Sequence, residues 1–309
     1  MTAKARKQST EEPNKASAKL DTMSALQIAK VINREDARLA AAVKKALPQI
    51  AKAIDLAADA LSRNGRLIYV GAGTSGRVAA LDAAEVPPTF SVEAWQVQYI
   101  IAGGEPALGS AAETKEDSRE LGEQDMAGRR PGPADLVVGI AASGRTPYTI
   151  AALEYAKAHG SRTVAVTCNA GSPLAKAAQF AIVTDVGPEV VTGSTRLKAG
   201  TAQKMVLNMI STGAMARLGY VYGNWMVKVH FGNQKLVERG LTVLHALTGL
   251  NQTRAAQLLH DARTLPVAVV MHMARVNRDE ALRRLGRARG NVRKAIEEKL
   301  VQKKQKGHK

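Results

Sequence analysis

The chain has 309 residues, of which 45% are apolar but only 4% aromatic, and its formal net charge is +17. Its single cysteine, Cys168, cannot form an internal disulfide, which indicates a reducing compartment. The N-terminus lacks the apolar segment of a secretory signal, and no apolar run approaches the ~18 residues that a membrane span needs. We therefore expect a cytoplasmic protein with no membrane association.

Most of the positive charge lies at the two ends of the chain. Residues 1–20 contain five Lys or Arg and two Glu, for a net charge of +3, and residues 275–309 contain thirteen Lys or Arg and four Asp or Glu, for +9. A nucleic-acid partner would require a basic surface with aromatic side chains for stacking, and the C-terminal segment has no aromatic residue. We expect residues 301–309 to form a solvated basic tail rather than a nucleic-acid site.

The first predicted element is helical and spans about residues 24–62. Apolar residues recur there at helical spacing, which predicts a stripe that packs on another element. The stripe consists of Leu39, Val43, Leu47, Ile50, Ile54 and Leu61. Pro48 interrupts it and marks a kink or the start of a second helix.

Five short apolar runs follow and predict strands. They show little polar alternation, as is typical of strands buried on both faces of a parallel sheet. The runs are RLIYV (66–70), VQYIIA (97–102), DLVVGIAA (135–142), TVAVTC (163–168) and FAIVTDV (180–186). Helix-like segments separate or follow them, at 76–84, about 106–121, 147–159, 172–178 and 198–218. The alternation predicts an α/β fold with a doubly wound parallel sheet, which binds its ligand at the carboxyl ends of the strands.

After about residue 241 the strand-like runs stop, and the apolar pattern becomes helical. We therefore divide the chain into an N-terminal tail (1–22), a sheet domain that begins with a helical hairpin (23–240), a helical C-terminal module (241–300) and the basic tail (301–309). The six histidines show no spacing typical of metal ligands, so no metal site is expected.

The loop GAGTSGR, which begins at Gly71, fits the G-x-G-x-x-G pattern of dinucleotide-binding domains. Such a site also requires an acidic residue at the end of the next strand, about 20 residues further on. Here the next strand ends in Gly103 and Gly104, and Glu105 lies 29 residues after Gly76. A Walker loop is excluded as well, because no G-K-[ST] follows.

Two hydroxyl-rich loops predict a phosphate site instead. Each follows a predicted strand and opens a helix, so its hydroxyls and backbone N–H groups can converge on an anion. Each loop alone is more often a helix cap, but the pair at neighbouring strand ends is typical of a phosphomonoester cradle. The cradle residues are Gly73, Thr74, Ser75, Ser143, Gly144, Arg145 and Thr146.

Four longer segments resemble the N-acetylmuramic acid 6-phosphate etherases, a family of sugar isomerase (SIS) domain proteins related to the glucokinase regulatory proteins. The segments are GAGTSGRVAALDAAEVPPTF, IAGGEPALGSAAETKEDSRELG, GIAASGRTPYTIAALEYA and GPEVVTGSTRLKAGTAQKMVLNMISTGAM. The similarity runs from about Thr10 to about Lys299, with small departures at Ala84 and Val86, where the family often has Ser and Cys. The resemblance implies a SIS-type fold, a phosphosugar ligand and a homodimer, because related domains often build their pocket across a two-fold interface.

The resemblance also implies a reaction, that of a carbon–oxygen lyase acting on N-acetylmuramate 6-phosphate without a cofactor. A base removes the proton on carbon 2 of the open sugar, and an acid protonates the departing D-lactate oxygen. Water then adds at carbon 3 to give N-acetylglucosamine 6-phosphate, in peptidoglycan recycling and amino-sugar catabolism. Two alternatives stay open: a non-catalytic phosphosugar-sensing regulator and an aldose–ketose phosphosugar isomerase.

Glu85 and Glu116 match the catalytic pair of that family. We assign the acid to Glu85, for which we expect partial burial beside Val86, since burial favours the protonated form of a carboxyl group. We assign the base to Glu116. Glu113 is expected on the solvated charged face of the same helix and serves as a non-catalytic control.

The segment from Gly187 to Lys204 adds three polar candidates, Glu189, Ser194 and Lys198. They contact the sugar or assist ring opening, or they stabilise the loop itself, and the sequence leaves both interpretations open. Lys235 is a further candidate for a phosphate contact.

Overall fold

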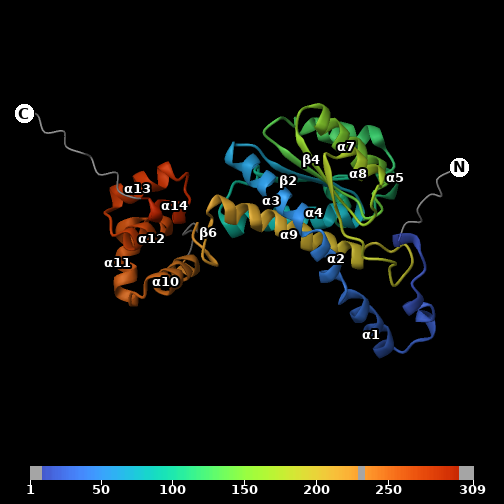
Figure 1. Ribbon diagram of the computed structural model, residues 1–309, viewed down its shortest axis with the longest axis horizontal. Helices are drawn as coiled ribbons and strands as arrows, with labels where there is room; N and C mark the ends of the chain where they lie inside the picture. Colours follow the sequence, from blue (N-terminus) through green and yellow to red (C-terminus); the bar gives the residue numbers. More distant parts are fainter. Residues whose placement is uncertain (1–8, 229–233, 299–309) are drawn as a thin grey trace, which may run out of the picture. The chain divides into compact units, whose positions relative to one another are not determined.

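The computed structural model describes residues 9–228 and 234–298, apart from the side chain of Lys235. The chain forms two compact units (Figure 1). Unit 1 comprises Met1–Pro88 and Val92–Ala214, and unit 2 comprises Thr89–Ser91 and Met215–Lys309. Among the described residues, no helix combines the length and the apolar character that crossing a lipid bilayer requires.

Unit 1 is built on a parallel sheet. Its strands are β1 (Leu67–Gly71), β2 (Val97–Ile101), β3 (Leu136–Ile140), β4 (Arg162–Thr167) and β5 (Phe180–Val183), in the order β2-β1-β3-β4-β5. This arrangement confirms the predicted α/β fold. Gly71, the last residue of β1, pairs with Ile101 on one side and Ile140 on the other. The loops that leave β1 and β3 therefore lie side by side, at the point where the strand order reverses.

Unit 1 also contains helices, most of which lie against the sheet, whereas α1 extends away from it (Figure 1). They are α1 (Ala25–Asp36), α2 (Leu39–Lys45), α3 (Leu47–Ser62), α4 (Gly73–Phe90), α5 (Glu113–Glu116), α6 (Arg119–Gly128), α7 (Pro147–Ala158), α8 (Pro173–Ala177) and α9 (Lys198–Leu218). Short 3₁₀ turns occur at Ser9–Glu11, Lys15–Ser17, Leu20–Thr22 and Glu105–Leu108.

The two faces of the sheet have different partners. Ile68 and Val70 of β1 are buried in one cluster with Tyr148 and Leu153 of α7. Tyr69 lies between them in sequence and points to the opposite face, because successive side chains of a strand alternate. Its hydroxyl donates a 2.8 Å hydrogen bond to Asp82 of α4.

Asp82 is a buried hydrogen-bond centre that fixes α4. Besides the Tyr69 hydroxyl, its carboxylate accepts hydrogen bonds from Asn208 (2.6 Å) and Ser211 (3.0 Å), both in α9. The buried carboxylate is thus paired with three donors, which offsets the cost of removing it from water. The network sets which side of α4 faces inward.

The N-terminal helical region is divided more finely than predicted. Ser24 begins α1 with a capping box, in which its side chain and that of Gln27 each bond the other's backbone N–H. The predicted interruption at Pro48 is the first turn of α3, where proline is tolerated. Most of the apolar stripe is buried within the chain, but Leu47 remains 43% exposed.

Helix α4 is longer than the predicted span of 76–84. It begins at Gly73 and continues through Pro87 and Pro88 to Phe90. Proline has a φ close to the helical value, so in the last turns these residues mainly remove their own bonds to the preceding turn. Glu85 therefore lies inside a helix rather than after one.

The segment predicted as one helix at about 106–121 is broken into three pieces. A 3₁₀ turn at Glu105–Leu108 is followed by the short helix α5 and then by α6. Ser118 separates the last two, because its hydroxyl accepts a 3.1 Å hydrogen bond from the backbone N–H of Leu121 and caps α6. Glu116 consequently lies in a single turn of helix, next to the carboxyl edge of the sheet.

In its described residues, unit 2 is helical apart from loops and one hairpin, formed by β6 (Val221–Tyr222) and β7 (Trp225–Met226). Its helices are α10 (Gln234–Thr248), α11 (Gln252–Ala262), α12 (Leu265–Ala274), α13 (Arg278–Arg287) and α14 (Val292–Glu297). Helix α12 is apolar and largely buried at the centre of this unit. The main segment of unit 2 begins at Met215, earlier than the expected boundary near residue 241, and Val227 and the hairpin side chains pack into the helical core.

Candidate active site

A cavity of about 380 Å³ lies in unit 1 where the loops after β1 and β3 emerge. The first loop contributes residues 72–75, and the second contributes residues 141–143. Segments 111–113 and 193–196 line the cavity as well. Five of the seven predicted cradle residues are brought together here: Gly73, Thr74, Ser75, Ser143 and Thr146.

Gly144 and Arg145 do not line the cavity but shape its second loop. Gly144 has a φ of 70°, and a Cβ there would lie 2.2 Å from Ser172 Oγ, so only glycine fits. The backbone N–H of Arg145 donates to Ser143 Oγ at 3.2 Å. Thr146 precedes α7 as its N-cap residue, yet its side chain makes no capping bond among the described residues. Its hydroxyl is therefore available to a ligand.

Ser75 is buried, and α9 holds its hydroxyl in place. Ser75 Oγ lies 3.1 Å from Gln203 Oε1. Gln203 Nε2 is buried without a hydrogen-bond partner among the described residues. In this arrangement the Ser75 hydroxyl donates to Gln203 Oε1, and a bound anion would accept that hydrogen only if the Gln203 amide turned over to donate through Nε2. Gln203 lies in the fourth segment that resembles the etherases, but its contact with Ser75 could not be predicted, because the two residues are 128 positions apart.

Glu116 lies directly against the first loop. A Cβ placed on Gly73 would be 2.9 Å from Glu116 Oε1, so the absence of a side chain at Gly73 makes room for the carboxylate. Burial raises the pKa of Glu116, and the negative charges of Asp117 and Glu113 raise it further, while Arg77 opposes them. A carboxylate with a raised pKa is a stronger base, so this group suits proton abstraction.

Arg77 positions the segment that precedes α5. Its Nε donates to the carbonyl oxygens of Ala107 (3.0 Å) and Leu108 (3.1 Å), and its Nη2 donates to that of Ser110 (2.7 Å). These three bonds tie the loop after β2 to α4 and thereby hold Glu116 near the cradle.

Glu113 was expected on a solvated helix face, but it lines the cavity. The reason is the break after α5, because a single helical turn between two loops has no continuous outer face. Glu113 is exposed, and its charge acts on Glu116. It is therefore unsuitable as a silent control.

Glu85 is exposed on α4 and does not line the cavity. The expected partial burial is wrong for the single chain, because Asp82 occupies the buried side of the helix. Leu81, one turn before Glu85, is also 50% exposed. Twelve residues of helix separate Gly73 from Glu85, which corresponds to about 18 Å along the axis. The two predicted catalytic carboxylates are thus not brought together within one chain.

Glu189 and Lys198 support the loop before α9 and do not line the cavity. Glu189 is fully buried and accepts bonds from the backbone N–H groups of Lys198 (3.0 Å) and Ala199 (2.9 Å). Burial raises the pKa of Glu189, although these bonds act in the opposite direction. Lys198 Nζ forms a buried 2.9 Å ion pair with Glu35 of α1. These contacts fit the interpretation that both residues stabilise the loop.

Ser194, the third candidate of this loop, does line the cavity. The side chain of Lys235 lies outside the described residues.

Comparison with known proteins places the chain in a family. The model of the glucokinase regulatory protein N-terminal SIS domain matches residues 49–157, and the SIS domain model matches residues 125–212. An N-acetylmuramic acid 6-phosphate etherase of Clostridium beijerinckii is 49% identical over 290 residues, covering 94% of this chain and 95% of the relative. The chain belongs to the N-acetylmuramic acid 6-phosphate etherase family. An etherase of Escherichia coli O1:K1 is 50% identical over 289 residues, 93% of this chain and 97% of its own.

The family assignment confirms the resemblance that the four sequence segments indicated. Solved structures with lower sequence identity include a phosphoheptose isomerase from Neisseria gonorrhoeae. The two sequences are 17% identical, the structural match covers 62% of this etherase-family chain and 100% of the isomerase chain, and the TM-score is 0.48.

In this etherase-family chain, residues 9–22 hold the loop before α9, although the sequence left them outside the sheet domain. Asn14 Nδ2 donates to the carbonyl oxygen of Pro188 at 3.0 Å, and Ser17 Oγ donates to that of Val190 at 2.6 Å. The sequence signal was present, since the resemblance to the etherases begins at Thr10. The structural role of residues 9–22 could not be predicted, because their hydrogen-bond partners lie more than 170 positions away in the sequence.

Four polar residues of the cavity had no role assigned from the sequence: Glu11, Arg77, Thr195 and Arg196. Glu11 reaches the cavity from the N-terminal segment, with its Oε2 3.3 Å from the Cβ position of Gly193. Thr195 and Arg196 directly follow the predicted Ser194 in the same loop. Both also lie in the fourth segment that resembles the etherases, which was the sequence signal for them.

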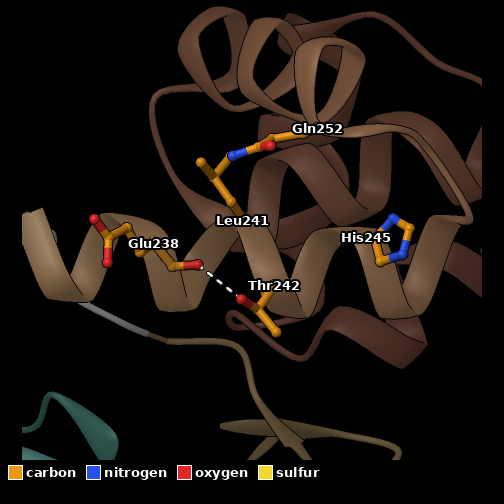
Figure 2. A pocket seen from close by; sticks show the side chains of 5 residues that line it. All are labelled: Glu238, Leu241, Thr242, His245 and Gln252. Carbon is orange, nitrogen blue, oxygen red and sulfur yellow. Dashed lines mark hydrogen bonds between the residues drawn. The ribbon is translucent and has the colours of Figure 1, made fainter.

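A second cavity, also of about 380 Å³, lies in unit 2 and contains none of the predicted site residues that the structure describes (Figure 2). It is lined by Glu238, Leu241, Thr242, His245 and Gln252. Its polar groups are used locally, since Thr242 Oγ1 donates to the carbonyl oxygen of Glu238 at 3.0 Å. No group of three or more His, Cys, Asp or Glu side chains arranged to hold a metal ion occurs in the described parts of the chain.

Proposed function

We propose that this member of the etherase family cleaves the D-lactyl ether of N-acetylmuramate 6-phosphate in the cytoplasm, as a step of peptidoglycan recycling and amino-sugar catabolism. The observation that carries the proposal is the position of Glu116, whose Oε1 lies 2.9 Å from the Cβ position of Gly73 in the predicted phosphate cradle. A basic carboxylate next to an anion site suits removal of a proton from a bound phosphosugar.

The 6-phosphate is assigned to the cradle of unit 1. Ser75, Ser143 and Thr146 provide hydroxyls, and the N-termini of α4 and α7 provide backbone N–H groups. Both helices begin at the cavity, so their dipoles favour a bound anion. The remaining length of the cavity accommodates the sugar beside α5, where Glu116 lies.

The chemistry follows from the acidity of carbon 2 in the open-chain sugar. Glu116 takes the carbon 2 proton, and the electron pair forms a double bond to carbon 3 as the ether bond to lactate breaks. Glu85 gives a proton to the departing lactate oxygen. Water then adds, with its hydroxyl on carbon 3 and its hydrogen on carbon 2, and this restores the saturated sugar. Each proton transfer is expected to contribute ~100- to 10,000-fold to the rate.

Glu85 takes part in this scheme if a second copy of the chain supplies it, and a homodimer is therefore part of the proposal. An apolar groove of about 590 Å³ between α3 and α9 is suited to the contact, with Leu47, Ile54 and Met209 among its lining residues. Asn208 also lines the groove and donates to Asp82 of α4, one turn from Glu85. The surface that would join two copies thus adjoins the face that carries Glu85.

The activity is tested by incubating the purified protein with N-acetylmuramate 6-phosphate and measuring D-lactate and N-acetylglucosamine 6-phosphate by mass spectrometry. Release of both products is expected. Exchange of the carbon 2 proton without lactate would instead indicate an isomerase, and binding without any reaction would indicate a sensor.

Isotope exchange separates the roles of the two glutamates. In deuterated water, Glu85→Gln should abolish lactate release and still exchange carbon 2 of N-acetylglucosamine 6-phosphate, because the base remains. Glu116→Gln should lose exchange and release together. The opposite pattern would reverse the two roles, and full lactate release by either variant would remove that residue from the mechanism.

A further inference from the structure

The loop before α9 carries an arginine that the proposed mechanism does not use. Arg196 follows Ser194 and Thr195, and all three line the cavity of unit 1. No hydrogen bond or ion pair joins the Arg196 guanidinium to any other described residue, so its five donors are open to a ligand.

The other cationic side chains near the cavity either bind other groups or do not line it. Arg77 also lines the cavity, but three of its bonds go to the carbonyl oxygens of the loop after β2. Lys198 is buried in its ion pair with Glu35. Arg145 belongs to the second cradle loop and does not line the cavity. Among the described residues that line the cavity, Arg196 is therefore the cationic side chain that is left to bind a ligand.

The cavity also contains three carboxylates, those of Glu11, Glu113 and Glu116. A ligand with a second negative charge, besides its phosphate, meets repulsion there unless a cation compensates for it. The proposed substrate has such a charge, since its lactyl group ends in a carboxylate. Arginine matches a carboxylate with two parallel N–H···O bonds, which provide direction as well as attraction.

We propose that Arg196 binds the lactyl carboxylate and so selects 6-phosphosugars that carry a carboxyalkyl ether at carbon 3. This inference rests on the proposed function and names the group of that substrate which the loop before α9 recognises. The ion pair between Arg196 and the lactyl carboxylate places the ether oxygen between two binding points. The cradle holds the 6-phosphate, and the loop before α9 holds the carboxylate. The product N-acetylglucosamine 6-phosphate lacks the lactyl group and makes no use of Arg196.

Binding to two ligands that differ only in the lactyl group tests the proposal. In a Glu116→Gln background, which keeps the substrate intact, calorimetry compares N-acetylmuramate 6-phosphate with N-acetylglucosamine 6-phosphate. Adding Arg196→Gln should weaken the first ligand about 10- to 100-fold, as expected for the loss of charge-assisted bonds, and change the second less than about 3-fold. Circular dichroism verifies that each variant is folded.

Arg63→Gln is the matched control, because it removes the same charge from an exposed arginine that precedes β1 at the opposite edge of the sheet. It should leave both affinities unchanged. A substrate analogue with a lactyl carboxamide adds a second readout. The Glu116→Gln protein should prefer the acid over the amide, and the added Arg196→Gln should abolish that preference.

Equal weakening of both ligands would overturn the proposal, because Arg196 would then serve the phosphate or the loop. Unchanged binding of N-acetylmuramate 6-phosphate would overturn it as well. If the ligand binds as expected but the wild-type protein releases no D-lactate, the proposed function fails while the assignment of Arg196 stands.

Discussion

The separation of the two glutamates leads to a prediction about how two copies of the chain share catalysis. Glu116 Oε1 lies beside Gly73 at the start of α4, and Glu85 lies about 18 Å further along that helix. The acid and the base act on neighbouring atoms of one sugar, so each must come within ~3 Å of its own proton. We expect each complete site to combine Glu116 of one copy with Glu85 of the other.

Mixed dimers of Glu85→Gln and Glu116→Gln, each inactive alone, should therefore recover activity. One of the two sites in such a dimer contains both intact glutamates, and the other contains both substitutions. A purified mixed dimer should release D-lactate at about half the wild-type rate, and an equilibrated equal mixture, in which about half of the dimers are mixed, at about a quarter. Two different affinity tags isolate the mixed dimer, and a D-lactate dehydrogenase assay measures the rate.

Dimers with Glu85→Gln in both copies, carrying the two tags, serve as the control and should stay inactive. An inactive mixed dimer would show that both glutamates must come from one chain. A monomer with full activity would refute the shared site altogether.

Three further predictions concern the cradle, the base and the buried ion pair. Ser75→Ala should weaken binding of the 6-phosphosugar by ~1–3 kcal/mol in calorimetry, without affecting binding of the unphosphorylated sugar. If the wild-type protein bound both sugars equally well, the assignment of the cradle to the phosphate would be wrong. Glu113→Gln should shift the acid limb of the pH profile of kcat/KM to lower pH. The substitution removes a negative charge that raises the pKa of Glu116, and Glu116 must be deprotonated to act as the base. An acid limb at the same pH as in the wild type would contradict the assignment of Glu116 as the base. Lys198→Met should lower the free energy of unfolding at pH 7 by ~1–3 kcal/mol in urea titrations, since buried Glu35 loses the ammonium of Lys198 but keeps its contacts with Arg38 and Asn14. Despite its burial, hydrogen bonds from Lys198 and Asn14 hold the pKa of Glu35 below its usual value. The ion pair therefore stabilises the fold above the unfolded-state pKa, and this stabilisation is lost as the pH falls through the lowered pKa. The difference in the free energy of unfolding between Lys198→Met and the wild type should become smaller at acid pH. A difference that does not depend on pH would contradict this account.

The sheet and the cradle could be predicted because both depend on local patterns. Strands buried on both faces, such as β1 and β3, appear as unbroken apolar runs whatever surrounds them. Ser75 and Ser143 could be placed together without a structure, since the carboxyl ends of parallel strands share one edge of the sheet.

Helix limits were less predictable, because tertiary contacts outweigh local propensity there. Pro87 and Pro88 indicate a helix end, but Asp82 anchors α4 on the sheet through Tyr69 and α9, and the helix continues past them. The opposite occurred near Glu116, where an acidic segment with helical composition is interrupted by the cap at Ser118.

The sequence by itself determined which chemical groups the chain can offer: hydroxyls at two strand ends, two glutamates in family motifs and a loop rich in polar residues. Only the tertiary structure decided which of them share a cavity. It placed Glu113 and Glu116 at the cradle, left Glu85 outside, and brought in Glu11 and Arg196 from distant segments. The physical reason is that periodicity and turn chemistry act over a few residues, whereas a site is formed by hydrogen bonds and packing between segments that are far apart in the chain.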